Sequence, residues 1–368
     1  DLTVIWAFVI AFAVLVYVVL DGFDLGLGML FAVEPEGEDR DIMMNSVAPI
    51  WDGNETWLVL GGGGLFAAFP LAYALILPAL YAPIMAMLLA LIFRGVAFEF
   101  RWRTKRWRKV WDVAFIGGSA VAALAQGITL GGLLQGIDVD KAAREYSGGW
   151  WDWLTPFTLM VGVAVMVGYA LLGATWLVMK TAGPLQERMR KRAWVLGVGT
   201  VIFMGVVSLW TPFLQDGYYS RWFGGWNIVL AAGVGAAVLG LAFGMFTSLM
   251  VRHHDYWPFL CALGMFILGF VGLGISIPLH RPGRGHDLGG RRPPQQPDLH
   301  AGRCGRADPG DPDLYRLFLL GVPRKDGPQG GVPLMPQSLR RLAWFVAIWL
   351  ASVAVIGTVA WIIRLWIA

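Results

Sequence analysis

Long runs of apolar residues constrain the fold of this chain more than any other feature. A helix needs about 20 apolar residues to cross the hydrocarbon core of a bilayer. Eight such runs precede residue 280, at about 3–26, 55–74, 76–98, 113–136, 154–179, 193–213, 226–250 and 257–278, and another covers 343–366. They lack the alternation of transmembrane strands. We therefore predict an all-α, polytopic membrane helical bundle with eight clear spans plus a C-terminal span.

The overall composition agrees with a membrane protein. Hydrophobic residues make up 57% of the chain and charged residues only 15%, whereas about a quarter of a soluble domain is charged. Cys261 and Cys304 form no CxxC pair, so neither a disulfide framework nor a metal knuckle is indicated. The first run lacks the basic start and cleavage site of a secretory signal, and we expect it to be a retained span.

The basic residues predict which way the bundle crosses the membrane. Loops expected on one side hold most of them: Arg40, Arg101, Arg103, Lys105, Arg106, Arg108, Lys109, Lys180, Arg188, Arg190, Lys191, Arg192 and Arg252. The opposite loops hold only Lys141, Arg144 and Arg221. By the positive-inside rule the richer side is cytoplasmic and the N-terminus lies outside. We interpret these clusters as topology signals rather than as a lipid or nucleic-acid site.

Two acids interrupt the first span near its cytoplasmic end. Asp21 and Asp24 lie in the stretch "VVLDGFDLGLGML", and a charged carboxylate at the bilayer centre costs roughly 2.5–3.5 kcal/mol even on insertion scales. Residues three apart share a helix face, so the two acids point the same way. Gly22 and Gly26 form a small-xxx-small pattern that lets a neighbouring helix approach closely.

Other polar residues are predicted to join these acids. The second span begins with "WDGNETW" and the third ends with "FRGVAFEFR". The candidate residues of a proton path or a buried ion pair are Asp21, Asp24, Asp52, Glu55, Arg94 and Glu99, and the accompanying motif residues are Trp51, Gly53 and Asn54. Such a set can relay protons near neutral pH. The alternative is an internal ion pair, for example of Arg94 with Asp21 or Asp24, that only fixes helix packing.

Haem ligands are missing from the predicted spans. A haem held between helices needs an inward-pointing axial ligand, most often histidine. His253 and His254 fall in a short loop, and the other histidines lie beyond residue 279. We interpret the methionines of the spans, such as Met85, Met87, Met160, Met166 and Met204, as core residues. We therefore expect no catalytic residue, no metal site and no haem ligand on this chain, and expect any haem iron to belong to a partner chain.

The segment 280–336 departs abruptly from the rest of the chain. It is rich in arginine, proline and glycine, and no span can be drawn through it. One interpretation is a loosely structured linker, which the composition permits. The other is a shifted reading frame that replaces a ninth span and fuses a neighbouring one-helix peptide, because the tail from Met335 resembles such a peptide.

Several long motifs carry a family resemblance. The stretches "LDGFDLGLGML", "NSVAPIWDGNETWLVLGGGGLFAAFP", "FRGVAFEFR", "WDVAFIGGSAVAALAQGITLGGLLQG" and "LLGATWLVMKT" resemble subunit II of the cytochrome bd-type quinol oxidases, including the cyanide-insensitive oxidase branch. The resemblance covers residues 1–279. It implies a heterodimer in the bacterial plasma membrane, in which subunit I carries haem b and haem d, oxidises quinol and reduces oxygen to water.

The resemblance also implies roles for parts of this chain. Acids of subunit II near the cytoplasm are proposed to help protons reach the oxygen site, and Asp21, Asp24 and Asp52 match those motif positions. The expected domains are 1–279, an oxidase subunit II-like membrane domain; 280–336, an irregular segment; and 337–368, a single helix similar to small single-span oxidase subunits. Partners would be subunit I, lipid and quinone, with no nucleic acid. The alternatives are an ion-coupled transporter, which buried acids and arginines also mark, and a purely structural oxidase subunit.

Overall fold

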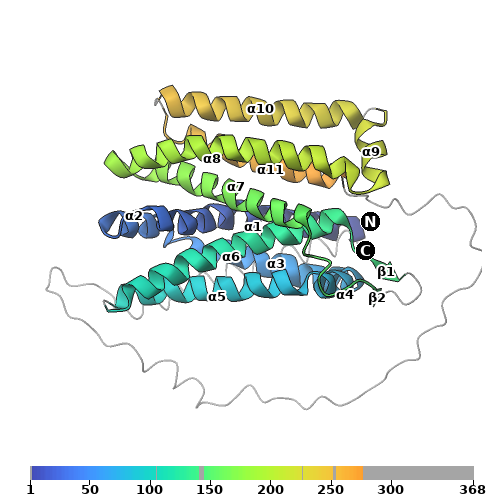
Figure 1. Cartoon of the computed structure of the whole chain (residues 1–368), viewed down its shortest axis with the longest axis horizontal. Coiled ribbons are helices and arrows are strands. Elements are labelled where there is room, and N and C mark those ends of the chain that lie inside the picture. The colour runs from blue at the N-terminus through green and yellow to red at the C-terminus, as the bar shows by residue number, and fades with distance from the viewer. Residues whose placement is uncertain (1, 105, 141–144, 226, 252–253, 277–368) are drawn as a thin grey trace, which may run out of the picture. The chain divides into compact units, whose positions relative to one another are not determined.

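Figure 1 shows the computed structural model of the chain. It describes residues 2–104, 106–140, 145–225, 227–251 and 254–276. The chain divides into two units, Asp1–Gly285 and His286–Ala368, and all described residues belong to the first. The predicted segments 280–336 and 337–368 and the run 343–366 lie outside the described residues, so their assignments stay predictions.

The described part of the chain is almost entirely helical. Its helices are α1 (Leu2–Leu30), η1 (Phe31–Val33), α2 (Glu38–Val47), α3 (Trp51–Ala68), α4 (Pro70–Ala79), α5 (Tyr81–Arg103), α6 (Arg108–Gln135), α7 (Pro156–Lys180), α8 (Gly183–Trp210), η2 (Thr211–Phe213), α9 (Asp216–Phe223), α10 (Asn227–Val251) and α11 (Trp257–Ser276). Two short antiparallel strands, β1 (Val139–Asp140) and β2 (Glu145–Tyr146), connect α6 to α7. The all-α class predicted from the sequence is confirmed.

Seven helices among the described residues are long and apolar enough to cross a membrane: α1, α5, α6, α7, α8, α10 and α11. The predicted count of eight before residue 280 is not confirmed, because the expected span 55–74 is not one helix. Pro70 has no backbone N–H and its ring excludes a preceding helical turn, so α3 ends at Ala68 and the short α4 starts at Pro70.

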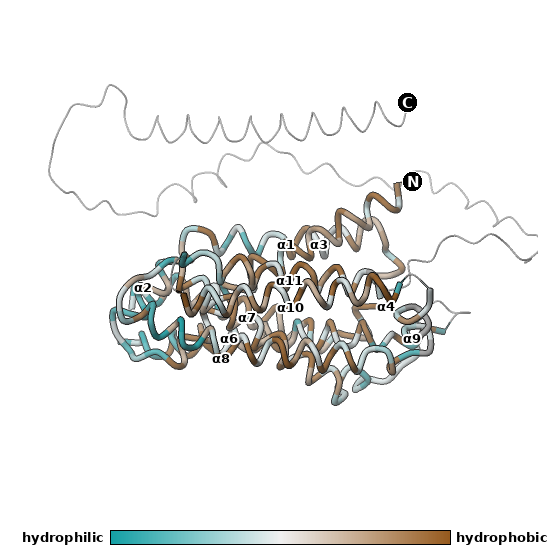
Figure 2. Tube along the Cα trace, turned by 90° about the horizontal axis from the view of Figure 1, so that it is seen from above, coloured by the Kyte–Doolittle hydropathy of each residue, from teal (hydrophilic) through white to brown (hydrophobic). Residues whose placement is uncertain are grey.

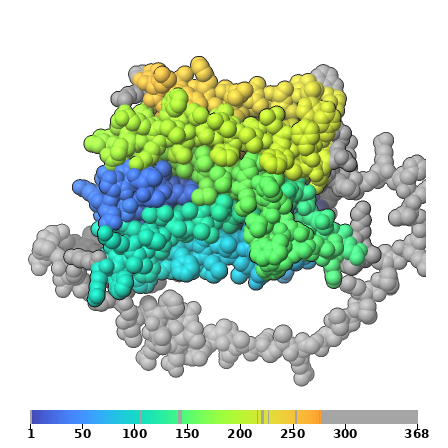
Figure 3. Space-filling model, viewed as in Figure 1, coloured from blue at the N-terminus to red at the C-terminus, as the bar shows by residue number. Residues whose placement is uncertain are grey.

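The long helices run side by side along one direction (Figure 1). Helix α1 packs against α3, α6 and α7, while α5 packs against α6, and α10 against α11. Hydrophobic residues fill the middle of the bundle, and hydrophilic residues gather mainly at the end that carries α2 (Figure 2). In the space-filling view, the N-terminal segment lies between α6 and α8 at that end (Figure 3). The second half of α1 is buried by its neighbours, which places its two acids inside protein.

Helices α1 and α7 are in backbone contact. A Cβ atom added at Gly26 would overlap the carbonyl group of Tyr169, and one added at Gly173 would overlap the backbone of Gly26 and Leu27. At Gly22 an added Cβ would lie 2.8 Å from the Tyr169 ring. The close approach predicted from Gly22 and Gly26 is thus confirmed, and α7 is the helix that approaches.

Candidate functional site

Five polar residues from three helices meet inside the bundle, and we refer to Asp21, Asp24, Asn54, Glu55 and Arg94 as the Arg94 cluster. Arg94 Nη1 donates to Asp21 Oδ1 at 3.1 Å and to Glu55 Oε1. Arg94 Nη2 lies 3.9 Å from Asp24 Oδ2, and the Asn54 amide donates to the same oxygen at 2.7 Å. The structure therefore joins α1, α3 and α5 through one guanidinium.

Among the charged residues of the Arg94 cluster, only Glu55 has a side chain that is partly exposed. The side chains of Asp21, Asp24 and Arg94 are at most 1% exposed, whereas that of Glu55 is 24% exposed. Glu55 lies in the second turn of α3, near the end of the bundle that carries α2. Any exchange of protons between the cluster and the outside of this chain therefore passes most directly through Glu55.

The charges of the Arg94 cluster do not balance if every acid is ionised. Three carboxylates face a single guanidinium, and a buried charge without a partner is strongly destabilising. Asp21 Oδ2, Asp24 Oδ1 and the Nε and Nη2 atoms of Arg94 also have no hydrogen-bond partner among the described residues. The arrangement is chemically suited to hold protons on some of its acids and to exchange them, which a fully matched ion pair is not.

The other predicted residues lie around or away from this cluster. Asp52 is exposed in the first turn of α3, next to Glu55, and Gly53 has open space around it. The Trp51 ring stacks on Phe98 at 4.9 Å between centroids, which fixes the start of α3 against α5. The structure does not bring Glu99 into the Arg94 cluster.

The side chain of Glu99 is 63% exposed on the outer face of α5. It makes only a weak pair with Arg103, one turn further on, at 3.9 Å. Residues five apart on a helix point about 140° away from each other, so Glu99 cannot face the same neighbours as Arg94.

The sequence-based prediction missed three hydrogen-bonded polar side chains that join α7, α6 and α1. The Tyr169 hydroxyl donates to Gln126 Oε1 at 2.8 Å, and Gln126 Nε2 donates to the Tyr17 hydroxyl oxygen at 2.6 Å. Tyr17 lies one turn before Asp21 on α1. A signal was present in the sequence, because glutamine is unusual in a span such as "AALAQGITL".

The same three residues line a partly open pocket of about 390 Å³. Its other walls are mostly apolar side chains of α1, α3, α6, α7, α8 and α11, among them Val14, Leu130 and Phe270. This polar chain thus forms part of the wall of a mostly apolar pocket.

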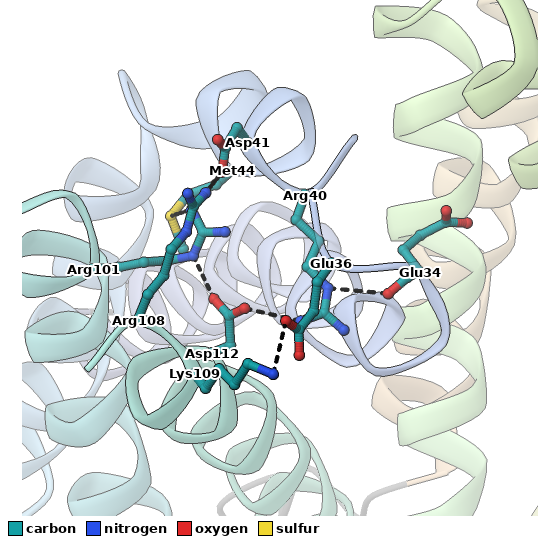
Figure 4. A network of polar contacts seen from close by, with 9 residues as sticks. All are labelled: Glu34, Glu36, Arg40, Asp41, Met44, Arg101, Arg108, Lys109 and Asp112. Carbon is teal, nitrogen blue, oxygen red and sulfur yellow. Dashed lines mark hydrogen bonds and ion pairs between the residues drawn. The ribbon is translucent and has the colours of Figure 1, made fainter. Parts of the chain in front are cut away.

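A second ionic network holds α2 onto the ends of α5 and α6 (Figure 4). The buried Asp112 carboxylate accepts a hydrogen bond from Arg40 at 2.9 Å and another from Arg101. Arg101 also donates to Asp41 at 2.7 Å, and Arg108 pairs with the same carboxylate. Asp41 and Asp112 both have arginine partners and Glu36 pairs with Lys109 at 3.3 Å, so we interpret the network as structural.

Glu34 forms a third ionic contact, between the end of α1 and the start of α8. Its buried carboxylate accepts hydrogen bonds from Arg188 at 2.9 and 3.1 Å and from Arg192. Arg188 also donates to Asp39 of α2 at 2.6 Å. Much of the basic charge that follows α7 in the sequence is therefore used in ion pairs within the chain.

The α2 network predicts a dependence of stability on pH. Burial alone would raise the pKa of Asp41, but hydrogen bonds from Arg108 and Arg101 hold that pKa below its usual value. Such a carboxyl adds stability above its unfolded pKa, near 4, and loses it as the pH falls through the lower folded pKa. Between about pH 5 and pH 3, we expect the thermal midpoint to fall more steeply in the wild type than in Asp41→Asn. The exposed Glu99→Gln serves as the control; equal slopes in the wild type and Asp41→Asn would contradict the prediction.

The described residues include few candidate ligands for iron or another metal. Among them the single histidine, His254, lies in the loop between α10 and α11, outside every helix. No group of three or more His, Cys, Asp or Glu side chains in the described part of the chain could hold a metal ion. Met87 is buried in the main apolar core.

Comparison with known proteins gives a consistent picture. The profile of a family described as "Cytochrome bd terminal oxidase subunit II" matches residues 2–280. Cytochrome bd-I ubiquinol oxidase subunit 2 from Escherichia coli (strain K12) is 39% identical over 221 residues, which is 58% of this chain and 58% of the relative. The matched part thus spans less than two thirds of that relative's length.

A second relative is matched over more of its length. Cytochrome bd ubiquinol oxidase subunit 2 from Bacillus subtilis (strain 168) is 34% identical over 277 residues, 74% of this chain and 77% of the relative. Among solved structures, the bd oxidase from Geobacillus thermodenitrificans superposes with a TM-score of 0.63 at 16% identity, over 75% of this chain and 84% of that chain. At that identity the superposition supports the fold alone.

Proposed function

The chain belongs to the cytochrome bd terminal oxidase subunit II family, and on that premise we propose that it is the second subunit of a quinol oxidase. In this proposal a partner, subunit I, carries haem b and haem d and performs quinol oxidation and oxygen reduction. The haems would supply the electron transfer and oxygen chemistry. The support from this chain is that its described residues offer no helix-borne histidine and no metal-binding group.

The proposed contribution of this chain to the reaction is access for protons from the cytoplasm. The observation that carries it is the Arg94 cluster, in which three acids share one arginine and only Glu55 reaches the surface. Reduction of oxygen to water consumes protons, and a route through low-dielectric protein needs groups that can accept and release them. In this proposal a proton taken up at Glu55 passes on to the buried acids that share Arg94 with it.

The orientation of the chain follows from its basic residues. The loops between α5 and α6 and between α7 and α8 lie at the end that carries α2 (Figure 1). Most lysines and arginines of the described residues lie in these loops or on the helix ends that flank them: Arg101, Arg103, Arg106, Arg108, Lys109, Lys180, Arg188, Arg190, Lys191 and Arg192. By the positive-inside rule this end faces the cytoplasm of a bacterial inner membrane, and the N-terminus lies outside. Glu55 and Asp52 then lie toward the side from which protons are taken.

Further partners are proposed on the sequence resemblance. The helix expected at 337–368 would correspond to a small single-span oxidase subunit, and lipid and quinone would surround or enter the complex. The competing proposal is that the Arg94 cluster is purely structural. Oxygen consumption and voltage generation in variants of Asp24 and Asp52 distinguish this role from proton access.

Removing the ionisable oxygen of Asp24 is expected to slow the oxidase. A positioned proton-transfer group contributes on the order of 100-fold to a rate. Because Glu55 and Asp52 remain, we expect Asp24→Asn to lower oxygen consumption by the two-subunit complex about tenfold, and to lower voltage generation in proteoliposomes in proportion. Asp52→Asn is expected to act in the same direction.

The matched control is Asp152→Asn, which changes an exposed acid between β2 and α7, at the other end of the bundle. Haem content per complex is measured for each variant, so that loss of assembly is not read as loss of proton access. Unchanged oxygen consumption and unchanged voltage in Asp24→Asn and Asp52→Asn would leave only a structural role for the cluster.

A further inference from the structure

The structure divides the basic residues at the α2 end of the bundle into two groups. Most of them pair with an acid of this chain: Arg40, Arg101, Arg108, Lys109, Arg188, Arg190 and Arg192. Two arginines of the turn 103–107, between α5 and α6, differ from these. The Arg103 side chain is 77% exposed and makes only a weak pair with Glu99, and Arg106 is exposed and forms no ion pair with a described residue. This turn therefore presents two guanidinium groups whose charge the chain leaves largely uncompensated.

Exposed tryptophans flank the two arginines. The side chains of Trp102 and Trp107 are 46% and 56% exposed. The Arg106 guanidinium lies over the Trp107 ring, 5.8 Å from its centroid, in a cation–π contact that orients it. Tryptophan is enriched where a membrane protein crosses the level of the lipid head groups. The rings thus indicate that Arg103 and Arg106 lie at the depth of the lipid phosphate groups.

Apolar faces of α5 and α6 lead from the same turn toward the middle of the bundle. Residues three or four positions apart share a helix face, and such a face of α5 ends at Arg103 and is exposed and apolar before it: Phe93, Val96 and Phe100. On α6, the exposed Val110 and Val113 follow Trp107. The two helices pack against each other. A molecule with an anionic head and long apolar chains would match both the turn and the faces that lead from it.

We propose that the turn 103–107 binds an anionic phospholipid of the cytoplasmic leaflet, with its phosphate held by Arg103 and Arg106 and its acyl chains along α5 and α6. Guanidinium groups bind phosphate through paired N–H donors, which gives a defined geometry. The leaflet follows from the proposed orientation of the chain. Proton access and the Arg94 cluster do not enter this inference, so it goes beyond the proposed function. For this turn it replaces the interpretation of the basic residues as topology signals alone.

The test is native mass spectrometry of the purified two-subunit complex in detergent, titrated with phosphatidylglycerol or with phosphatidylethanolamine. The wild type should bind the first phosphatidylglycerol more tightly than the first phosphatidylethanolamine, whose ammonium group cancels the phosphate charge. A basic residue near a membrane surface adds about fivefold to the binding of anionic lipid, so Arg103→Gln combined with Arg106→Gln should weaken the first phosphatidylglycerol by roughly 25-fold. Both side chains are exposed, so the double variant should fold and keep its haem content.

The matched control is Lys180→Gln combined with Lys191→Gln. It removes the same charge from exposed positions on α7 and α8, at the same end of the bundle. The affinity of this control for phosphatidylglycerol should stay close to that of the wild type. Glycerol phosphate, the charged head without acyl chains, should not displace the bound lipid at equal concentration.

Three outcomes would overturn the proposal. Unchanged phosphatidylglycerol affinity in the arginine double variant would remove the site, and equal losses in the two double variants would mean attraction by charge alone. Displacement by glycerol phosphate would mean a site for soluble phosphate and not for lipid. Loss of the haem-bearing partner from the arginine double variant would mean that the turn contacts that subunit.

Discussion

Replacing Arg94 with methionine is expected to destabilise the complex by about 3–5 kcal/mol, the range for removing one partner of a buried ion pair. The guanidinium is fully buried and contacts acids on α1 and α3. Methionine keeps much of the side-chain volume, so the loss of stability reflects the removed charge and not a change in packing. Thermal unfolding of the purified complex, followed by tryptophan fluorescence and haem absorbance, measures the effect.

The control for Arg94→Met lies on the same helix. The Arg103 side chain is 77% exposed and makes only a weak pair with Glu99, so Arg103→Met should change stability by less than about 0.5 kcal/mol. A second substitution sharpens the argument: adding Asp21→Asn to Arg94→Met should recover part of the loss, because it removes a carboxylate that has no cation. Equal thermal midpoints for Arg94→Met and Arg103→Met would show that the ion pairs of Arg94 do not stabilise the complex.

The sign of the pH effect on Arg94→Met also follows from the structure. Without the arginine, the buried acids must bind protons to remain inside protein. The folded variant therefore binds more protons than its unfolded chain near neutral pH, and its stability rises as the pH falls. The difference from the wild type should be largest at neutral or alkaline pH and smaller near pH 5.

Much of this cluster could be predicted from the sequence because charge inside a span is rare. Asp21, Asp24 and Arg94 each interrupt an apolar run, and the expected topology put all three toward one side of the membrane. The ion pair of Arg94 with Asp21, 73 positions apart, was among the alternatives considered. The sequence alone could not decide which acid would lie closest, because that depends on how α1 and α5 are rotated about their axes.

The differences between the predictions and the structure have identifiable physical origins. Glu99 was grouped with Arg94 by nearness in sequence, although five residues on a helix correspond to a rotation of about 140° from the shared face. The span 55–74 was drawn through Pro70, which ends α3. Gln126 and Tyr169 were missed for a different reason: their meeting depends on the contact between α6 and α7, which no local pattern encodes.

Replacing Gly26 with alanine is expected to separate α1 from α7 and to destabilise the complex by roughly 1–3 kcal/mol or more, the range for overpacking a well-packed site. The added methyl group would overlap the Tyr169 carbonyl and lie 3.0 Å from the Gly173 nitrogen, and neither is the end of a flexible side chain. The helices can accommodate it only by moving apart.

This displacement would also reach the Arg94 cluster, because both ends of the polar chain depend on the same contact. Tyr17 and Asp21 lie on α1, and Tyr169 lies on α7, with Gln126 bonded to both tyrosines. Gly26→Ala should therefore reduce oxygen consumption as well as the thermal midpoint of the assembled complex. The matched control is Gly117→Ala on α6, where an added Cβ meets nothing within 4 Å. Alanine is favoured over glycine by about 1 kcal/mol in a helix, so the control should be neutral or stabilising. Equal thermal midpoints for the two variants would show that α1 and α7 can move apart without a loss of stability.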